Sequence, residues 1–448
     1  MVVGGGIAGL TAAWELGRST THDIVLLEAS PRPGGKLLTT RCGGALVEEG
    51  ADAFVATTPD VVDLARSAGL SARLVSPAVF AADLWLDGAL RPMPQATLFG
   101  VPARPFAAVK TGVLSPRGAL QAAAENLTLR PLSGPDLPVA TFVEERLGRE
   151  VLDRLVEPVL AGTRSGRPED LSLAAALPEV DELARRERSV TKALRSRRSR
   201  AQPPAFRSLA GGLGELVEAL QTGPFRLRLG SPVTSLQRAG RGYEAVLEDG
   251  TGVPAAAAIV AVPAPRAAGI LAEAAPRAAE ALTGIPFTPA AVLTFAFRSS
   301  SVPVPRDRSG VLLPRTQAGV LTAATWYSSK WPGSGPVDVV RAFAGRAGTE
   351  EVLSLPDDDL SRQALHELED MVGRLPEPQA VKVTRWSDGL PQYRIGHRER
   401  LHSLEEALLE HPRLALAGAS YRGPGITACV ASGKRAAARV AAAPARQT

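Results

Sequence analysis

Short apolar runs typical of buried strands alternate with amphipathic stretches at both ends of the chain. The apolar run 2–3 precedes a stretch over 8–17 whose leucines and alanines fall on one face of a helix, and a second apolar run follows at 23–27. Near the C-terminus, an apolar run at 414–417 leads through small residues into a helical stretch over 427–442. Such alternation of short apolar runs with helical periodicity predicts a parallel sheet covered by helices.

A glycine-rich turn joins the first strand to the first helix. The spacing G-x-G-x-x-G falls on Gly4, Gly6 and Gly9. The first glycine permits the turn, the second lets the backbone approach a pyrophosphate, and the third lets the helix pack closely on the strand. Glu28 ends the second strand, 19 residues after Gly9, where a carboxylate is expected to bind a ribose hydroxyl and to repel the 2′-phosphate of NADP. These residues predict a dinucleotide site, with a purely structural glycine turn as the alternative.

The pattern divides the chain into three domains and places the fold in the α/β class. A Rossmann-like nucleotide-binding domain takes the segments 1–94, 206–262 and 381–448. A mainly helical domain takes 95–205. An inserted, strand-rich α+β domain takes 263–380 and is expected to form one wall of a substrate cavity.

Composition changes this picture little. Hydrophobic residues make up 45% of the 448 residues and charged residues 22%, as in an ordinary soluble globular protein. The net charge of +5 and the arginine-rich stretch 185–200 favour a solvated, mildly basic surface over a site for an anionic ligand or a membrane. No aromatic interleaving or nucleic-acid motif accompanies these arginines, so we expect no nucleic-acid partner.

Cysteine, histidine and hydropathy patterns exclude further classes. Cys42 and Cys429 are too few for a disulfide framework or a cysteine metal cluster and favour a reducing compartment, hence the cytoplasm. The five histidines have no ligand spacing, so we predict no metal site. Prolines and an arginine interrupt the long apolar stretch 255–276, so no transmembrane segment is expected. Because the run 2–3 already belongs to a strand, we also expect no signal peptide.

Motifs spread along essentially the whole chain resemble those of one family. The segment from Glu28 to Lys36 resembles the E-x(5)-GG-[RK] segment of the FAD-dependent amine oxidase superfamily, and 49–54 resembles its flavin-side loop. The W…PQY…GH pattern over 386–397 and the G-x-GI-x-x-C-[IV]-x-SG pattern over 423–433 are similar to signatures of its protoporphyrinogen and coproporphyrinogen oxidases. The resemblance is nearest to the soluble coproporphyrinogen III oxidases of Gram-positive, especially actinobacterial, bacteria.

The resemblance implies FAD as the cofactor. Related amine oxidases often attach flavin to a cysteine near the position of Gly418, where this chain has none, and Cys429 lies past the turn, so the FAD is expected to be non-covalent. Lys36 would add positive charge near the pyrophosphate, with a solvated surface lysine as the alternative. For Val233, core packing is the alternative. The implied FAD contacts are Gly4, Gly5, Gly6, Ile7, Ala8, Gly9, Glu28, Ala29, Lys36, Gly50, Ala51, Asp52, Ala53, Val233, Trp386, Gly425, Ile426 and Thr427.

The resemblance further implies an enzyme of haem biosynthesis that oxidises coproporphyrinogen III to coproporphyrin III in three two-electron steps, with O2 as acceptor and H2O2 as product. The alternatives are a protoporphyrinogen IX oxidase, a flavin amine oxidase and a non-enzymatic carrier on the same fold. Arg91 and Arg164 are candidates to bind the propionates of the tetrapyrrole substrate, with a structural role as the alternative for each. Arg164 stands where the family commonly has an aromatic residue. No general base is identified, and a downstream ferrochelatase is an implied partner.

Overall fold

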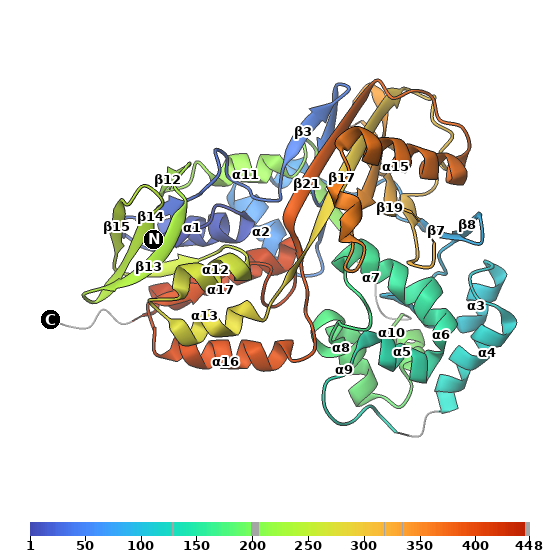
Figure 1. Cartoon of the computed structure of the whole chain (residues 1–448), viewed down its shortest axis with the longest axis horizontal. Coiled ribbons are helices and arrows are strands. Elements are labelled where there is room, and N and C mark those ends of the chain that lie inside the picture. Colours follow the sequence, from blue (N-terminus) through green and yellow to red (C-terminus); the bar gives the residue numbers. More distant parts are fainter. Residues whose placement is uncertain (128–129, 199–205, 318, 334, 444–448) are drawn as a thin grey trace.

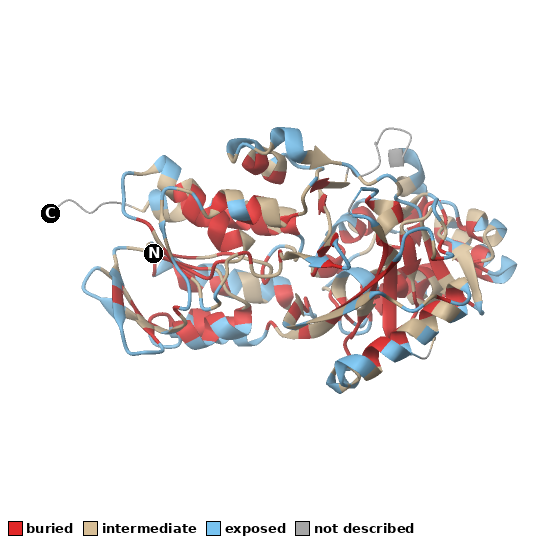
Figure 2. Cartoon of the chain, turned by 90° about the horizontal axis from the view of Figure 1, so that it is seen from above, coloured by how far each residue is buried: buried red, intermediate tan, exposed pale blue. Residues whose placement is uncertain are grey.

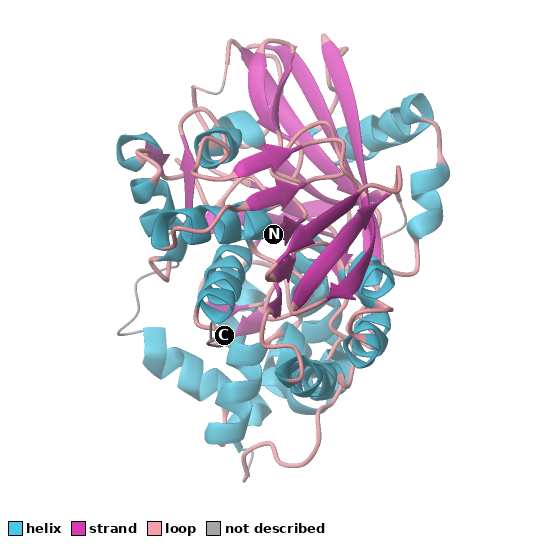
Figure 3. Cartoon of the chain, turned by 90° about the vertical axis from the view of Figure 1, so that its left-hand side faces the viewer, coloured by secondary structure: helices cyan, strands magenta, loops and turns pink. Residues whose placement is uncertain are grey.

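The structure is a computed structural model that describes residues 1–127, 130–198, 206–317, 319–333 and 335–443. Figure 1 shows a sheet with flanking helices around the N-terminus, and a second sheet and a helical part at the other end of the molecule. Two long strands, β17 (Phe287–Arg298) and β21 (Ala380–Pro391), run from the first part into the second sheet. Figure 3 separates a strand-rich upper part from a mainly helical lower part.

A five-stranded sheet unites the three segments predicted to form the nucleotide-binding domain. All of its neighbouring strand pairs are parallel. The two central strands that begin at Val2 and Ala258 are buried throughout, which accounts for their continuous apolar sequences. In hydrogen-bonded order the strands are β12 (Arg226–Arg228), β2 (Val25–Leu27), β1 (Val2–Val3), β16 (Ala258–Val260) and β22 (Leu414–Leu416).

Helices cover both faces of this sheet, and Figure 2 shows the buried residues gathered where helices and strands meet. One face carries a core shared by α1 (Ile7–Ser19), α2 (Asp60–Ser67), α11 (Gly214–Leu220) and α17 (Ile426–Ala441). The other face carries a core shared by a small antiparallel sheet and three helices. These elements are β13 (Val233–Ala239), β14 (Gly242–Leu247), β15 (Gly252–Ala255), α12 (Ala264–Leu271), α13 (Pro276–Thr283) and α16 (His397–Leu409).

The second sheet has seven strands in the order β21-β17-β20-β19-β18-β7-β8. Its long strands pair antiparallel, and one face packs against helix α15 (Asp357–Val372). A short helix, α14 (Tyr327–Lys330), follows β19. The remaining bounds in this sheet are β7 (Ala82–Leu86), β8 (Ala89–Pro92), β18 (Gly310–Leu312), β19 (Leu321–Trp326) and β20 (Val337–Ala344).

The helical part shares a single core and lies below the second sheet in Figure 1. Between α6 and α7 the helix widens to a π-helical turn over Leu152–Val156. The helices are α3 (Pro105–Lys110), α4 (Pro116–Ala124), α5 (Val139–Leu147), α6 (Arg149–Val151), α7 (Glu157–Arg164), α8 (Leu173–Ala176), α9 (Pro178–Arg186) and α10 (Val190–Arg198). Part of the arginine-rich stretch 185–200 lies outside the described residues.

Short strand pairs complete the connections. They are β3 (Thr39–Cys42) with β4 (Ala45–Glu48), β11 (Phe206–Leu209) with both β5 (Phe54–Val55) and β6 (Leu74–Val75), and β9 (Thr97–Leu98) with β10 (Val101–Pro102). Short 3₁₀ turns lie at Ser71–Arg73, Glu125–Leu127 and Glu350–Ser354. Within the described ranges, no helix is long and apolar enough to cross a membrane.

Two groups of elements belong to other domains than the domain boundaries predicted from sequence indicate. Strand β7, inside segment 1–94, pairs in parallel with β18 and so belongs to the seven-stranded sheet. Helices α12 and α13, inside segment 263–380, pack with α16 on the parallel sheet. Both placements depend on contacts between residues far apart in the chain, which the local hydrophobic pattern does not encode.

Candidate functional site

The turn between β1 and α1 has a geometry that requires glycine. Gly4 has a φ of +101°, and a Cβ on Gly9 would lie 1.9 Å from the carbonyl oxygen of Gly4. A Cβ on Gly6 would meet no heavy atom of the described chain within 4 Å, and Gly6 gives α1 no side-chain cap. The first turn of α1, including Ile7 and Ala8, therefore presents backbone N–H groups to an open space where an anion such as a pyrophosphate can bind.

The carboxylate of Glu28 is oriented by the same turn. Its Oε2 accepts a hydrogen bond from the backbone N–H of Gly5 at 2.5 Å, and its Oε1 accepts one from the backbone N–H of Ser30 at 2.8 Å. Ala29, between Glu28 and Ser30 in the chain, is exposed. Glu28 thus stands at the carboxyl ends of β1 and β2, where the ribose of a bound dinucleotide is expected in such sheets.

The C-terminal turn between β22 and α17 lies at the same edge of the sheet, because both helices follow parallel strands. Gly425 precedes α17 without a side-chain cap, and a Cβ there would meet no described heavy atom within 4 Å. Thr427 donates its hydroxyl to the carbonyl oxygen of Val55 at 2.6 Å, and Ile426 is buried. A Cβ on Gly433 would lie 2.3 Å from the carbonyl oxygen of Ala8, so α17 packs directly on α1. The structure brings the two predicted ends of the site together.

Lys36 lies between these two turns. A Cβ on the preceding Gly35 would come within 3.2 Å of the Cα of Gly6, and the Lys36 ammonium lies 5.3 Å from the centre of the Phe287 ring. Burial lowers the pKa of Lys36, while the nearby charge of Asp388 raises it. A largely desolvated ammonium beside a glycine turn attracts an anion more strongly than a solvated one does.

Loop 50–53 is held by side chains from helix α14, the residue after it and strand β20. Lys330 donates to the Asp52 carboxylate at 2.8 Å, Trp331 Nε1 donates to it at 3.1 Å, and Arg341 donates to the carbonyl oxygen of Gly50 at 2.6 Å. Burial alone would raise the pKa of Asp52, but the charges of Lys330 and Arg341 outweigh it and lower the pKa to about 2. The Asp52 side chain is therefore engaged within the protein, and the main chain of the loop is the part left for a cofactor.

Trp386 and Val233 approach this region from two other strands. Trp386 Nε1 donates to the carbonyl oxygen of Glu49 at 2.7 Å, which fixes the start of the same loop. Val233 is half-buried and lies two residues after Ser231, whose N–H donates to the carbonyl oxygen of Glu28 at 2.9 Å. Val233 thus lies close in the chain to the Glu28 loop and also packs on the sheet core.

The two candidate substrate arginines occupy different surroundings, and among the described residues no hydrogen bond or ion pair joins them. Arg164 ends α7, where its Nη2 donates to the carbonyl oxygen of Ala176 at 3.2 Å and its guanidinium lies 6.0 Å from the centre of the Phe99 ring. Burial lowers the pKa of Arg164, with the hydroxyl of Tyr393 nearby. Arg91 is on β8, beside Gly112.

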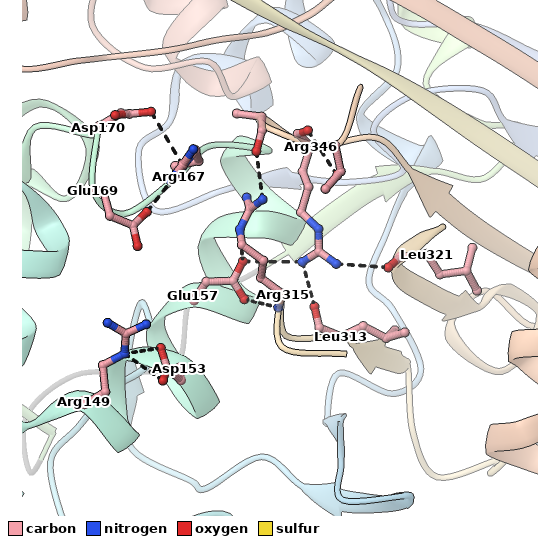
Figure 4. Close-up of polar contacts among 12 residues, drawn as sticks. Arg149, Asp153, Glu157, Arg167, Glu169, Asp170, Leu313, Arg315, Leu321 and Arg346 are labelled. Atoms are coloured by element: carbon pink, nitrogen blue, oxygen red, sulfur yellow. Dashed lines mark hydrogen bonds and ion pairs between the residues drawn. The ribbon is translucent and has the colours of Figure 1, made fainter. Parts of the chain in front are cut away.

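Glu157, at the start of α7, ties the helical part to the seven-stranded sheet (Figure 4). Its carboxylate accepts the backbone N–H of Arg315 at 2.8 Å and lies 3.5 Å from Arg315 Nε and 3.4 Å from Arg346 Nη1. Arg346 also donates to the carbonyl oxygens of Leu313 and Leu321. Glu157 and Arg346 are both buried, so the orientation of α7, and with it of Arg164, depends on this cluster.

Sequence reasoning did not assign roles to Arg341 or to the pair Gln392 and Tyr393. Arg341 is fully buried in β20, and the sequence signal for it was an arginine between the apolar residues 339–340 and 342–344. Gln392 and Tyr393 lie inside the PQY signature, which indicated the family without indicating what the side chains contact. Tyr393 hydrogen-bonds to the C-terminal turn, and Gln392 to the end of α7.

Comparisons with known proteins give consistent results over nearly the whole chain. The family model described as flavin containing amine oxidoreductase matches residues 7–441. A Bacillus subtilis protein named coproporphyrinogen III oxidase is 31% identical over 97% of this chain and 96% of its own. A Mycobacterium tuberculosis protein of the same name is 34% identical over 97% of this chain and 95% of its own. A solved structure from Exiguobacterium sp. 255-15, provisionally named a protoporphyrinogen oxidase, is 30% identical with a TM-score of 0.87 and covers 98% of this chain and 97% of its own.

Proposed function

This chain belongs to the family of flavin-containing amine oxidoreductases, and from that premise we propose that it oxidises coproporphyrinogen III to coproporphyrin III. The observation that carries the proposal is the match, over nearly the full length of both chains, to relatives named coproporphyrinogen III oxidase. Two features of the structure support it: the uncapped helix starts that the two ends of the chain bring to one edge of the parallel sheet, and a desolvated arginine in the helical part.

The residues of the site fit a non-covalent FAD. The uncapped start of α1 and the Lys36 ammonium would hold its pyrophosphate, and Glu28 would accept from a ribose hydroxyl. The uncapped start of α17 would direct its positive dipole towards the flavin ring. When bound, the flavin supplies the two-electron oxidation. Burial raises the pKa of Cys429 to about 12, which keeps it a thiol and so unreactive towards covalent attachment.

The chain's own contribution is to bind and orient the substrate. Coproporphyrinogen carries four propionates, and the desolvated guanidinium of Arg164 is suited to a carboxylate, with Arg91 as a second candidate. Three two-electron steps with O2 would yield three H2O2 for each porphyrin. A cytoplasmic location and a contact with ferrochelatase are further predictions that rest on the same resemblance.

An aerobic assay with added FAD tests the proposal. Purified protein is given coproporphyrinogen III or protoporphyrinogen IX, and porphyrin fluorescence and H2O2 are followed together. We expect faster turnover of coproporphyrinogen III and about three H2O2 per porphyrin formed. The name of the Exiguobacterium structure favours protoporphyrinogen IX as the second candidate substrate, and preference for it would overturn the proposal. H2O2 well below this ratio would instead reject O2 as the acceptor.

A further inference from the structure

We propose that Gln392 and Tyr393 are positioning residues that couple substrate binding at the end of α7 to cofactor binding at the turn between β22 and α17. The inference rests on the proposed function and deepens it by linking its two sites. It is drawn from the contacts of these two adjacent buried side chains, which are 3% and 2% exposed. Gln392 contacts the end of α7, and Tyr393 contacts the turn.

Tyr393 holds the cofactor turn at two points. Its hydroxyl donates to the carbonyl oxygen of Ala419 and accepts the backbone N–H of Gly423 at 2.9 Å. These partners flank the middle of the turn that leads into the uncapped start of α17. One hydroxyl therefore joins two backbone groups of the turn, and its removal would leave a partly buried N–H and a carbonyl oxygen without that partner.

The same turn is held by side chains on either side of it. His397 stacks on the Tyr393 ring with centroids 4.1 Å apart, and its Nε2 lies 2.9 Å from the carbonyl oxygen of Tyr421. Ser420 accepts the backbone N–H of Ala264 at 3.0 Å through its hydroxyl oxygen. The turn is therefore built to one conformation, and the Tyr393 hydroxyl bonds two of its backbone groups.

Gln392 contacts the end of α7, where Arg164 is the proposed substrate residue. Its Nε2 donates to the carbonyl oxygen of Arg164 at 2.9 Å, at the last residue of α7. Its own backbone N–H donates to the carbonyl oxygen of Pro286 at 2.8 Å, and the carbonyl oxygen of Tyr393 accepts the N–H of Ser172 at 2.9 Å. The backbone between the two side chains is thus fixed from both sides, so a shift of α7 is transmitted to the turn.

A link through residues 392–393 couples the two ligands because the binding of each requires this segment to be ordered. A ligand that orders one end removes part of the ordering cost for the other, and the coupling acts equally in both directions. FAD should therefore strengthen the binding of a porphyrin, and the porphyrin should strengthen the binding of FAD.

The test measures the dissociation constant of coproporphyrin III, the stable oxidised product, for the FAD-free and FAD-loaded protein. In the unmodified protein we expect FAD to tighten porphyrin binding about tenfold, inside the usual range of allosteric coupling. Tyr393→Phe keeps the ring on His397 but removes the hydroxyl. It should raise the FAD dissociation constant about tenfold and reduce the coupling to about twofold or less.

Gln392→Met and Tyr243→Phe complete the design. Gln392→Met should weaken porphyrin binding about fivefold, leave FAD binding to the porphyrin-free protein within about twofold, and also reduce the coupling. Tyr243→Phe is the matched control, since it removes another buried tyrosine hydroxyl, which lies on strand β14 and 3.3 Å from His411 Nδ1. It should leave the tenfold coupling unchanged.

The outcomes separate this inference from the proposed function. If the unmodified protein binds FAD and porphyrin without coupling, or if Tyr393→Phe keeps the coupling, the inference is overturned while the proposed function stands. An equal loss in Tyr243→Phe would also overturn it, because the effect would then be general. If the unmodified protein binds neither ligand, the proposed function itself fails. Circular dichroism reports whether each variant folds. If Tyr393→Phe does not fold, the coupling measured for Gln392→Met decides the test.

Discussion

Glu48 illustrates how its surroundings decide the charge of a single residue. Its carboxylate is 1% exposed and accepts the backbone N–H of Leu213 at 2.6 Å and the hydroxyl of Thr39 at 3.0 Å. Burial raises its pKa from 4.5 to about 7, although these hydrogen bonds act in the opposite direction. Between these two pH values the folded protein holds more protons than the unfolded chain, so the contribution of Glu48 to stability falls as pH rises.

Glu48→Gln should remove this pH dependence. Relative to the variant, the unmodified protein should lose on the order of 3 kcal/mol of unfolding free energy between about pH 4.5 and 8. Urea unfolding of both proteins at several pH values in this window measures the difference. Glu350→Gln, at an exposed glutamate, serves as the control substitution. A difference between the two proteins that stays constant with pH would contradict the prediction.

Single residues could be predicted from sequence where their role is local. Gly4 and Gly9 follow from the turn they form, and Glu28 from its position at the end of a strand. The ion pairs of Asp52 could not be predicted, since Lys330 lies 278 positions further along the chain. No spacing rule relates residues so far apart, and the FAD contact assigned to Asp52 by resemblance stays a prediction.

At the scale of elements, the close packing of α1 on α17 depends on small residues. Replacing Gly433 by alanine would place a Cβ 2.3 Å from the carbonyl oxygen of Ala8 and 3.0 Å from Thr11 Cβ. Because both neighbours belong to the rigid helix α1, the two helices must separate. Gly433→Ala should therefore destabilise the protein by about 1–3 kcal/mol, as overpacking does, and should weaken FAD binding.

Gly269→Ala is the matched control for this prediction. Gly269 lies within helix α12, where a Cβ would meet no described heavy atom within 4 Å. Alanine there should raise the unfolding free energy by roughly 0.5–1 kcal/mol through helix propensity alone. Urea unfolding and FAD titration of both variants measure the contrast. Equal unfolding free energies of the two variants would show that α1 and α17 can separate without loss of stability.

Elements with strong periodicity could be predicted from sequence, and those in alanine-rich segments could not be placed. The helix expected over 8–17 is found as α1, Ile7–Ser19, and the one expected over 427–442 as α17, Ile426–Ala441. Because α12 and α13 are rich in alanine, their two faces differ too little in hydrophobicity to indicate which sheet each helix covers. Their packing is decided by partners on α16, more than 100 residues later.

At the scale of the whole molecule, the meeting of both chain ends at one sheet edge could be predicted, because each end carries its own motif. The joint between the helical part and the seven-stranded sheet could not. The sequence around Glu157 carries no local signal for its partners, and Arg315 and Arg346 lie in loops without any recognisable pattern. The Glu157 cluster in this joint is electrostatic, and charge complementarity between distant segments leaves no periodic signal in sequence.

This joint leads to a prediction for the assembly of the whole chain. Glu157→Gln removes the negative charge that Arg315 and Arg346 share and leaves Arg346, 3% exposed, as an uncompensated buried cation. Loss of one partner of a buried ion pair costs about 3–5 kcal/mol. We expect a loss of that size in urea unfolding, with the helical part unfolding before the seven-stranded sheet.

Two comparisons decide whether charge pairing is the cause. Glu169→Gln breaks the exposed pair with Arg167, whose side chains are 46% and 48% exposed, and should change stability by less than about 1 kcal/mol. The double variant Glu157→Gln with Arg346→Met removes both charges and should recover part of the loss, because no unpaired cation then remains at that position. If the double variant were less stable by the sum of the two single losses, the cluster would not act as a pair. The orientation of α7 would then have to rest on the apolar contacts between the two parts instead.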